Sequence, residues 1–273
     1  MSAKIFEALR FDENGPSATD ECVVEEQPLL IRVNGNPFTL TLRTPGDDRH
    51  LILGLLFSEG VIERPSDVAS MSEEAPQGGA AVWSLRLPNT VVVPGKLSGR
   101  SLVSTSSCGL CGKTEWNASP RPPKGENDGT RAIPQSLLTQ CFRALSARQT
   151  VFSRTGGSHA AGIFSADGDL LAFGEDAGRH NAVDKAVGDL WARGRLHEGF
   201  LLCVSGRVSY EIASKASRAG FAVLAAVSAP SSMAVEFCRE VGITLIGFCR
   251  GDRATVYSHP ERFAVPAHQE LTV

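Results

Sequence analysis

Two cysteines, Cys108 and Cys111, stand three positions apart in residues 104–113, a stretch dominated by small and hydroxylated side chains. The stretch lacks the apolar run that a core segment needs, so it is expected to be a loop. A thiolate is the reactive form of cysteine, and a neighbouring cation such as Lys113 favours that form. The Cys-x-x-Cys spacing therefore predicts thiol chemistry on a loop.

Three interpretations of this pair stay open on the residues alone. A structural zinc site needs four ligands, and no second Cys-x-x-Cys accompanies the first, while His159 and His180 are not arranged as a pair. A thioredoxin-like redox pair is expected between a strand and a helix, yet this one precedes the proline-rich residues 118–129. The third interpretation is a nucleophilic thiol that meets a partner on a loop.

Polar residues follow three apolar strand-like segments in the second half of the chain. In open α/β sheets, ligands bind beyond the carboxyl ends of the strands, and arginine forks suit phosphate. A plainer interpretation is that serine, glycine and proline only turn the chain at these points. As candidate ligand-binding residues we take Ser205, Gly206, Arg207, Ser228, Phe248, Cys249, Arg250, Gly251, Asp252 and Arg253.

Residues 174–185 hold an unusual density of charged side chains around His180. We include His180 among the candidate binding residues. The alternative is a capping and salt-bridge cluster, because ion-pair networks also gather charges. His159 follows a glycine turn and, taken alone, is more simply a structural histidine.

The first third of the chain predicts a small α+β unit. Residues 1–21 are polar and are expected to form a loose terminus. Asn34-Gly35 between apolar runs predicts a β-hairpin, and a helix is expected from about 48 to 59. Further strands are expected at residues 82–87 and 90–93.

The second half alternates strand and helix patterns. This alternation predicts an α/β fold with a parallel or mixed sheet covered by helices. We divide the chain into an N-terminal α+β unit (1–103), the Cys-x-x-Cys loop and linker (104–131) and an α/β domain (132–273). Strands are expected at 160–165, 170–173, 200–204, 222–227, 243–248 and 254–257, and helices from 134, from 181, at 209–219 and at 231–241.

Composition narrows the class of protein. The 273 residues carry a net charge of −3, which gives no basic field for nucleic acid. No apolar run approaches the roughly 20 residues that a membrane-spanning helix needs. The seven cysteines suggest no disulfide framework, and the start of the chain lacks a signal-peptide pattern, so a reducing cytoplasm is expected.

Taken together, the motifs resemble the FdhD/NarQ family, accessory sulfurtransferases for formate dehydrogenase. The resemblance covers nearly the whole chain. It rests on residues 43–48, 107–112, 155–161, 175–185, 205–209, 228–230, 247–251 and 256–262.

The resemblance implies a cytidine-deaminase-like core and a sulfurtransferase function. The family takes persulfide sulfur from a cysteine desulfurase, here on Cys108 with Cys111 as helper. It passes the sulfur to the molybdenum cofactor, Mo-bis-molybdopterin guanine dinucleotide, before that cofactor enters formate dehydrogenase. The cofactor is then a bound substrate, held at the strand ends, and the family suggests a homodimer.

Two further expectations accompany this resemblance. The chain lacks the deaminase zinc signature, so deaminase chemistry does not follow from the fold, and no permanently bound metal is expected. The alternative function is a chaperone that binds the molybdenum cofactor without transferring sulfur.

Overall fold

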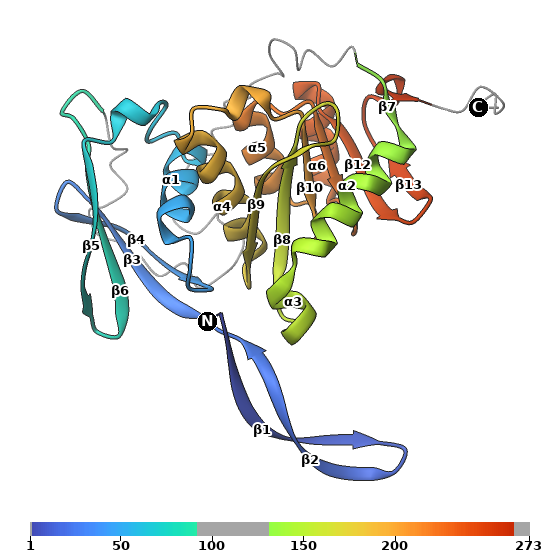
Figure 1. The fold of residues 1–273 in the computed structure, drawn as a ribbon. Coiled ribbons are helices and arrows are strands. Elements are labelled where there is room, and N and C mark those ends of the chain that lie inside the picture. Colours follow the sequence, from blue (N-terminus) through green and yellow to red (C-terminus); the bar gives the residue numbers. More distant parts are fainter. Residues whose placement is uncertain (1, 92–130, 265–273) are drawn as a thin grey trace.

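The computed structural model describes residues 2–91 and 131–264, and its first element is a projecting hairpin (Figure 1). Strands β1 (Ala3–Asp12) and β2 (Gly15–Val24) pair antiparallel along their full length. The expectation of a loose terminus is therefore wrong. The hairpin stands away from the core, so the apolar side chains of β1 follow no buried pattern, and Ile5, Phe6, Leu9 and Phe11 are each more than half exposed.

A four-stranded sheet follows, in the order β4-β3-β6-β5. The turn between β3 and β4 has positive φ at Asn34 (51°) and Gly35 (81°), as a type I′ hairpin requires. The predicted Asn-Gly hairpin is thus confirmed. The strands are β3 (Gln27–Val33), β4 (Asn36–Arg43), β5 (Ser70–Gln77) and β6 (Ala80–Arg86), with the 3-10 turn η1 (Pro65–Asp67) leading into β5.

Two other expectations for this unit have different outcomes. Helix α1 (Asp48–Ser58) agrees with the predicted helix. The predicted strand at residues 90–93 is wrong for the part that the structure describes, because the Val91 amide donates to the Pro88 carbonyl (2.9 Å) in a turn. Residues 92 and 93 lie outside the described part of the chain.

The second half contains a six-stranded mixed sheet in the order β13-β12-β11-β10-β8-β9. Strands β10, β11 and β12 are mutually parallel, whereas β8, β9 and β13 run antiparallel to their neighbours. The predicted mixed α/β fold is confirmed. The strands are β8 (His159–Phe164), β9 (Leu170–Asp176), β10 (Leu201–Val204), β11 (Val223–Ala226), β12 (Thr244–Arg250) and β13 (Arg253–Val256).

Helices cover both faces of this sheet. Helices α4 (Arg179–Ala192), α5 (Tyr210–Ala219) and α6 (Ser232–Val241) share one apolar cluster with alternate strand residues such as Leu202 and Leu224. Helix α2 (Gln135–Arg148) packs on the other face, against Leu201 and Val223. The short elements are α3 (Thr150–Thr155), η3 (Leu196–Glu198), η4 (Pro260–Arg262) and the paired strands β7 (Ile133–Pro134) and β14 (Phe263–Ala264).

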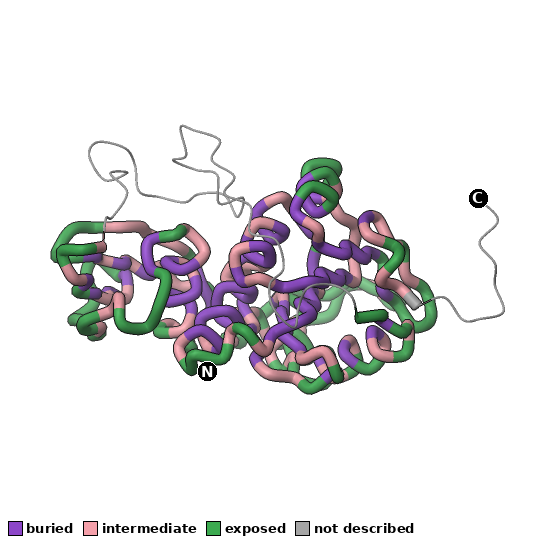
Figure 2. The backbone as a smooth tube through the Cα atoms, turned by 90° about the horizontal axis from the view of Figure 1, so that it is seen from above, coloured by how far each residue is buried: buried purple, intermediate pink, exposed green. Residues whose placement is uncertain are grey.

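The N-terminal sheet and the large sheet share a core through α1 and α4. A Cβ at Gly54 of α1 would overlap the Asp184 carbonyl oxygen, and one at Gly188 of α4 would overlap the His50 carbonyl oxygen. The two helix backbones therefore touch where both residues are glycine. Buried residues, purple in Figure 2, continue through this contact into both sheets. The proposed boundaries at 103 and 131 stay a prediction.

Among the residues that the structure describes, no helix combines the length and apolarity needed to cross a membrane.

Candidate functional site

The three predicted strand ends lie side by side at one edge of the large sheet. Since β10, β11 and β12 are parallel neighbours, the loops after them leave the same edge. The Ser205 hydroxyl accepts from the Ala160 amide (2.9 Å), and the Phe248 amide donates to the Ser228 carbonyl (3.2 Å). Adjacent loops are thus fastened to one another, which gives the edge a fixed shape.

Gly206 lies at the inner end of this edge, where the chain must approach a neighbouring strand closely. A Cβ at Gly206 would lie 3.1 Å from His159 Nδ1 and 3.6 Å from the Arg179 Cβ. Arg207 follows directly on the exposed side. The loop after β10, the start of β8 and the start of α4 therefore bring together the guanidinium groups of Arg207 and Arg179 and the imidazole of His159.

The charge around His159 favours an anion. Burial lowers the pKa of His159 from 6.5, and Arg179, His180 and Arg207 lower it further, while Asp176 acts in the opposite sense. The imidazole is consequently neutral at pH 7. A neutral histidine among arginines can accept or donate a hydrogen bond, and an anion entering here would relieve the local positive charge.

His180 is held by protein groups on its buried side. Its Nε2 lies 3.1 Å from the Ser209 hydroxyl and 3.0 Å from Glu211 Oε2, both at the start of α5. His180 and Glu211 are each about nine-tenths buried. These two contacts fix the orientation of the His180 ring beside the site.

Behind these groups lie two buried ion pairs, which fix the start of α4. Lys215 Nζ is 2.7 Å from Asp184 Oδ1, and Ser58 donates to the same carboxylate (3.0 Å). Burial raises the pKa of Asp184, and Lys215 opposes that effect. Lys185 Nζ is 2.8 Å from Asp176 Oδ2. For Asp176, Asp184 and Lys185, the structure therefore agrees with the interpretation of residues 174–185 as a salt-bridge cluster.

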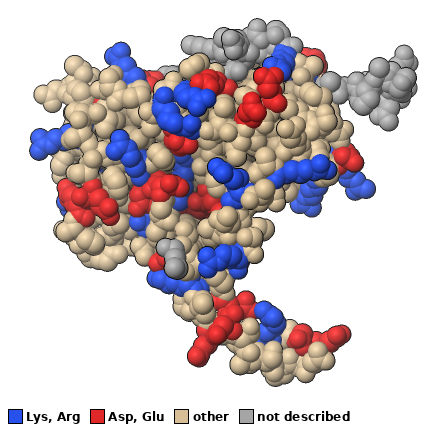
Figure 3. Space-filling model, viewed as in Figure 1, with Lys and Arg blue, Asp and Glu red and all other residues tan. Residues whose placement is uncertain are grey.

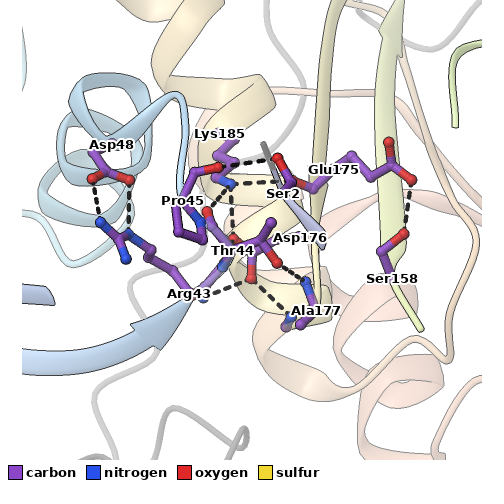
Figure 4. A network of polar contacts seen from close by, with 12 residues as sticks. Ser2, Arg43, Thr44, Pro45, Asp48, Ser158, Glu175, Asp176, Ala177 and Lys185 are labelled. Atoms are coloured by element: carbon purple, nitrogen blue, oxygen red, sulfur yellow. Dashed lines mark hydrogen bonds and ion pairs between the residues drawn. The ribbon is translucent and has the colours of Figure 1, made fainter. Parts of the chain in front are cut away.

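The chain between β4 and α1 is tied to this network, as Figure 4 shows. The Thr44 amide donates to Asp176 Oδ2 (3.0 Å), and Lys185 Nζ donates to the Thr44 carbonyl (2.9 Å). Arg43 forms a two-bond pair with Asp48, with its Nη2 2.6 Å from Oδ2 and its Nε 2.9 Å from Oδ1. The N-terminal sheet thereby positions the sheet edge that holds His159.

The outer end of the edge is the β12–β13 hairpin. Phe248 has a φ of 53°, which is rare for an aromatic residue, and its side chain is 43% exposed. An open cavity of about 800 Å³ lies beside it, and its volume is in the range of ligand pockets. The lining residues are Gln135, Phe248, Arg250, Asp252, Arg253, Ala254, Thr255 and Phe263.

Cys249 faces the opposite way from Phe248. Its thiol lines a separate cavity of about 240 Å³ under α2, together with Gly251. Arg253 borders both cavities. Burial raises the pKa of the Cys249 thiol to about 11, so it is protonated at neutral pH and is a poor nucleophile.

The structure groups the predicted binding residues and adds others. Ser205, Gly206, Arg207 and His180 gather at the inner end, Phe248, Arg250, Asp252 and Arg253 at the outer end, and Ser228 lies between. Arg179, from the charged stretch 174–185, also belongs to the inner group. Ser209 and Glu211 join it through His180 without having been predicted, because each reads as an ordinary residue at the start of a helix. Cys108 and Cys111 lie outside the described residues.

The FdhD/NarQ family model matches residues 24–264. A sulfur carrier protein FdhD from Streptomyces coelicolor is 43% identical over 271 residues and covers 95% of each chain. The protein of that name from Mycobacterium tuberculosis is 43% identical over 252 residues, covering 89% of this chain and 91% of its own. That from Sulfurisphaera tokodaii is 36% identical over 269 residues, covering 96% and 99%.

A solved structure has the same fold. It is described as a putative formate dehydrogenase accessory protein from Desulfotalea psychrophila. The two chains superpose with a TM-score of 0.74 at 22% identity, over 97% of this chain and 100% of the other.

Proposed function

Because the chain belongs to the FdhD/NarQ family, we propose that it is a sulfur carrier that acts in the maturation of formate dehydrogenase. The match to the family model over residues 24–264 carries this proposal. Relatives named sulfur carrier protein FdhD align along nearly their whole length, which supports a shared activity.

In the proposed reaction, the Cys108 thiolate attacks the outer sulfur of a persulfide on a cysteine desulfurase. A new S–S bond forms at Cys108, the donor's S–S bond breaks, and the donor thiolate leaves. Cys111 is the helper thiol, sharing the sulfur or releasing it as sulfide by forming a disulfide with Cys108. In support, Cys141, Cys203, Cys238 and Cys249 are buried, so these four thiols are poor competitors for a donor protein.

The acceptor in this proposal is the molybdenum cofactor, in its guanine dinucleotide form, bound as substrate in the cytoplasm. The strand-end edge supports this assignment, since guanidinium groups and a glycine-lined approach suit phosphate. Arg207 and Arg179 would hold phosphate at the inner end, and Arg250 and Arg253 at the outer end. Formate dehydrogenase would receive the completed cofactor.

The test is transfer of sulfur to the intact protein. Incubation with a cysteine desulfurase and cysteine should add one sulfur atom to Cys108, as read by mass spectrometry of alkylated peptides. The Cys108→Ala chain should gain none there and should fail to mature formate dehydrogenase, whereas Cys22→Ser, which removes the partly exposed thiol of β2, should behave as the native chain.

The alternative is a chaperone that holds the cofactor without moving sulfur. The charged edge favours binding whether or not sulfur moves, so this function keeps some support. If guanine nucleotide binds while Cys108 never gains sulfur, the chaperone function replaces the sulfur carrier.

A further inference from the structure

A second pocket, separate from the strand-end edge, lies between helix α2 and the β12–β13 hairpin. Helix α2 crosses one face of the large sheet, with its start beside this hairpin (Figure 1). We call the space the α2 pocket. It has a volume of about 240 Å³ and is lined by side chains from residues 135–146 of α2 and from residues 249–254 of the hairpin.

The α2 pocket is preformed, because hydrogen bonds fix the spacing of its two walls. The Thr139 hydroxyl donates to the Gly251 carbonyl (3.2 Å), and the Gln135 side-chain amide donates to the Asp252 carbonyl. The β12–β13 ladder also shifts register between Gly247 and Arg250, and such bulges re-aim side chains. The pocket therefore keeps its shape without a ligand, as small-molecule sites usually do.

The floor of the α2 pocket is apolar. Leu138 and Phe142 stand four residues apart on one side of the helix, and Cys249 and Ala254 face them from the hairpin. Leu138 is 2% exposed and Cys249 is 6% exposed. A protonated thiol behaves as a small apolar group, and its sulfur contacts aromatic rings favourably. The floor therefore suits a flat, apolar ligand body.

The mouth of the same pocket is basic. Arg143 of α2 and Arg253 of β13 both line it, and both are exposed. No described residue forms an ion pair or a hydrogen bond with either guanidinium. Two such cations at one mouth repel each other, and an anion between them would relieve the repulsion. In Figure 3, more basic than acidic side chains lie on the side of the molecule that carries α2 and the hairpin.

The chemistry of the mouth favours a carboxylate. The planar guanidinium fork matches the two oxygens of a carboxylate, and it also stacks on an aromatic ring. A ligand that joins a ring to a carboxylate would use the floor and the mouth together. It would cover apolar surface and supply the missing negative charge in one molecule.

Size separates this pocket from the outer cavity of the strand-end edge. Ligand pockets usually hold roughly 300–1,000 Å³. The outer cavity, about 800 Å³, is within that range, whereas the α2 pocket is below it. Phe248 lines only the outer cavity and Cys249 only the α2 pocket, although Arg253 borders both. The α2 pocket therefore suits a molecule smaller than a nucleotide.

We infer that the α2 pocket binds a small aromatic carboxylate, with its ring against Phe142 and Cys249 and its carboxylate between Arg143 and Arg253. The inference is independent of sulfur transfer, because Phe142 and Arg143 do not belong to the strand-end edge. Its failure would leave the proposed sulfur carrier function as it stands.

The test is isothermal titration calorimetry of the intact chain with 2-naphthoate. The native chain should bind this probe at one site per chain. The uncharged amide 2-naphthamide has the same rings and should bind about tenfold more weakly, because a charge-assisted hydrogen bond is lost. Acetate should also bind about tenfold more weakly, because it leaves the apolar floor in contact with water.

Variants of α2 locate the site. Arg143→Met should weaken 2-naphthoate about tenfold and leave 2-naphthamide unchanged. Ser146→Phe should abolish binding of both, since position 146 lines the pocket one turn beyond Phe142. The control Arg148→Met removes an exposed arginine of the same helix that does not line the pocket, and it should bind as the native chain does. Circular dichroism checks that each chain is folded.

A resonance within the floor gives a second readout. In methyl NMR, the Leu138 signals should shift during the 2-naphthoate titration, whereas those of Leu29 in the N-terminal sheet should not.

Four results would overturn the inference. The native chain could fail to bind 2-naphthoate at millimolar concentration. It could bind the acid and the amide equally, so that the guanidinium groups take no part. Arg148→Met could weaken binding as much as Arg143→Met, which would indicate general surface charge. Finally, a folded Ser146→Phe chain could bind with unchanged affinity, which would place the probe elsewhere.

Discussion

At the scale of single residues, the strand-end edge shows how one glycine allows charge to gather. Gly206 has no side chain, so His159 and Arg179 approach the loop that carries Arg207. Any larger residue would push the imidazole away. The cluster is thus a property of three separate segments, and its anion preference belongs to no single residue.

Arg207 provides the most direct measure of anion binding. Charge-assisted hydrogen bonds contribute about 1.5–3 kcal/mol, so Arg207→Met should weaken binding of guanosine diphosphate at least tenfold in isothermal titration calorimetry. The control Arg86→Met removes an exposed arginine from β6. Equal affinities for the two variants would show that nucleotide binds elsewhere.

His159 gives a prediction about acid stability. Its pKa is lowered in the folded chain, so below pH 6.5 the unfolded chain binds more protons, and stability falls as pH decreases toward the folded pKa. His159→Gln removes this dependence. Between pH 7.5 and 5.5, the free energy of unfolding should therefore fall more for the native chain than for the variant.

Urea titrations at both pH values measure the difference. The control is the surface variant His197→Gln, which shows the effect of losing one histidine away from the site. Saturating phosphate should reduce the extra loss of unfolding free energy that the native chain shows at pH 5.5 relative to His159→Gln, because an anion at the site favours the imidazolium. An unchanged gap would argue against an anion beside His159.

At the scale of elements, α1 and α4 depend on their facing glycines. Gly54→Ala would drive a methyl group into the Asp184 carbonyl, so the helices must separate. Overpacking of this kind costs about 1–3 kcal/mol. The variant's midpoint should fall in thermal or urea unfolding, whereas Arg49→Ala on the exposed side of α1 should change it little. A Gly54→Ala chain as stable as the native one would show that the helices can part freely.

Most elements were predictable from sequence because their signals are local. The Asn34-Gly35 turn, the Gly220 and Gly242 helix ends and the buried strands each follow from nearby residues. The β1–β2 hairpin was missed because both strands are mostly solvated, so their apolar residues show no buried face. The grouping of His159 with Arg179 was missed because strand pairing, which joins distant segments, decides it.

At the scale of the whole molecule, the shared core predicts a single cooperative unfolding transition. Trp83 lies in β6 and Trp191 in α4, and both belong to the same apolar cluster. Chains carrying Trp83→Phe or Trp191→Phe each keep one of these reporters. Fluorescence should give urea midpoints that match the far-UV circular dichroism of the same variant. Two separated midpoints would instead support independent units on either side of residues 104–131.

The distribution of thiols has a practical consequence for labelling chemistry. Cys141, Cys203, Cys238 and Cys249 are buried, and burial raises the pKa of Cys238 to about 12. Within the described part of the chain, Cys22 alone is partly exposed. A Cys22→Ser chain should therefore take up maleimide dye quickly only at Cys108 or Cys111. One substitution would turn the Cys-x-x-Cys pair into the attachment point for a fluorescent reporter, and the mass of the labelled peptide, which differs by one sulfur atom between a thiol and a persulfide, would show whether a desulfurase had loaded it.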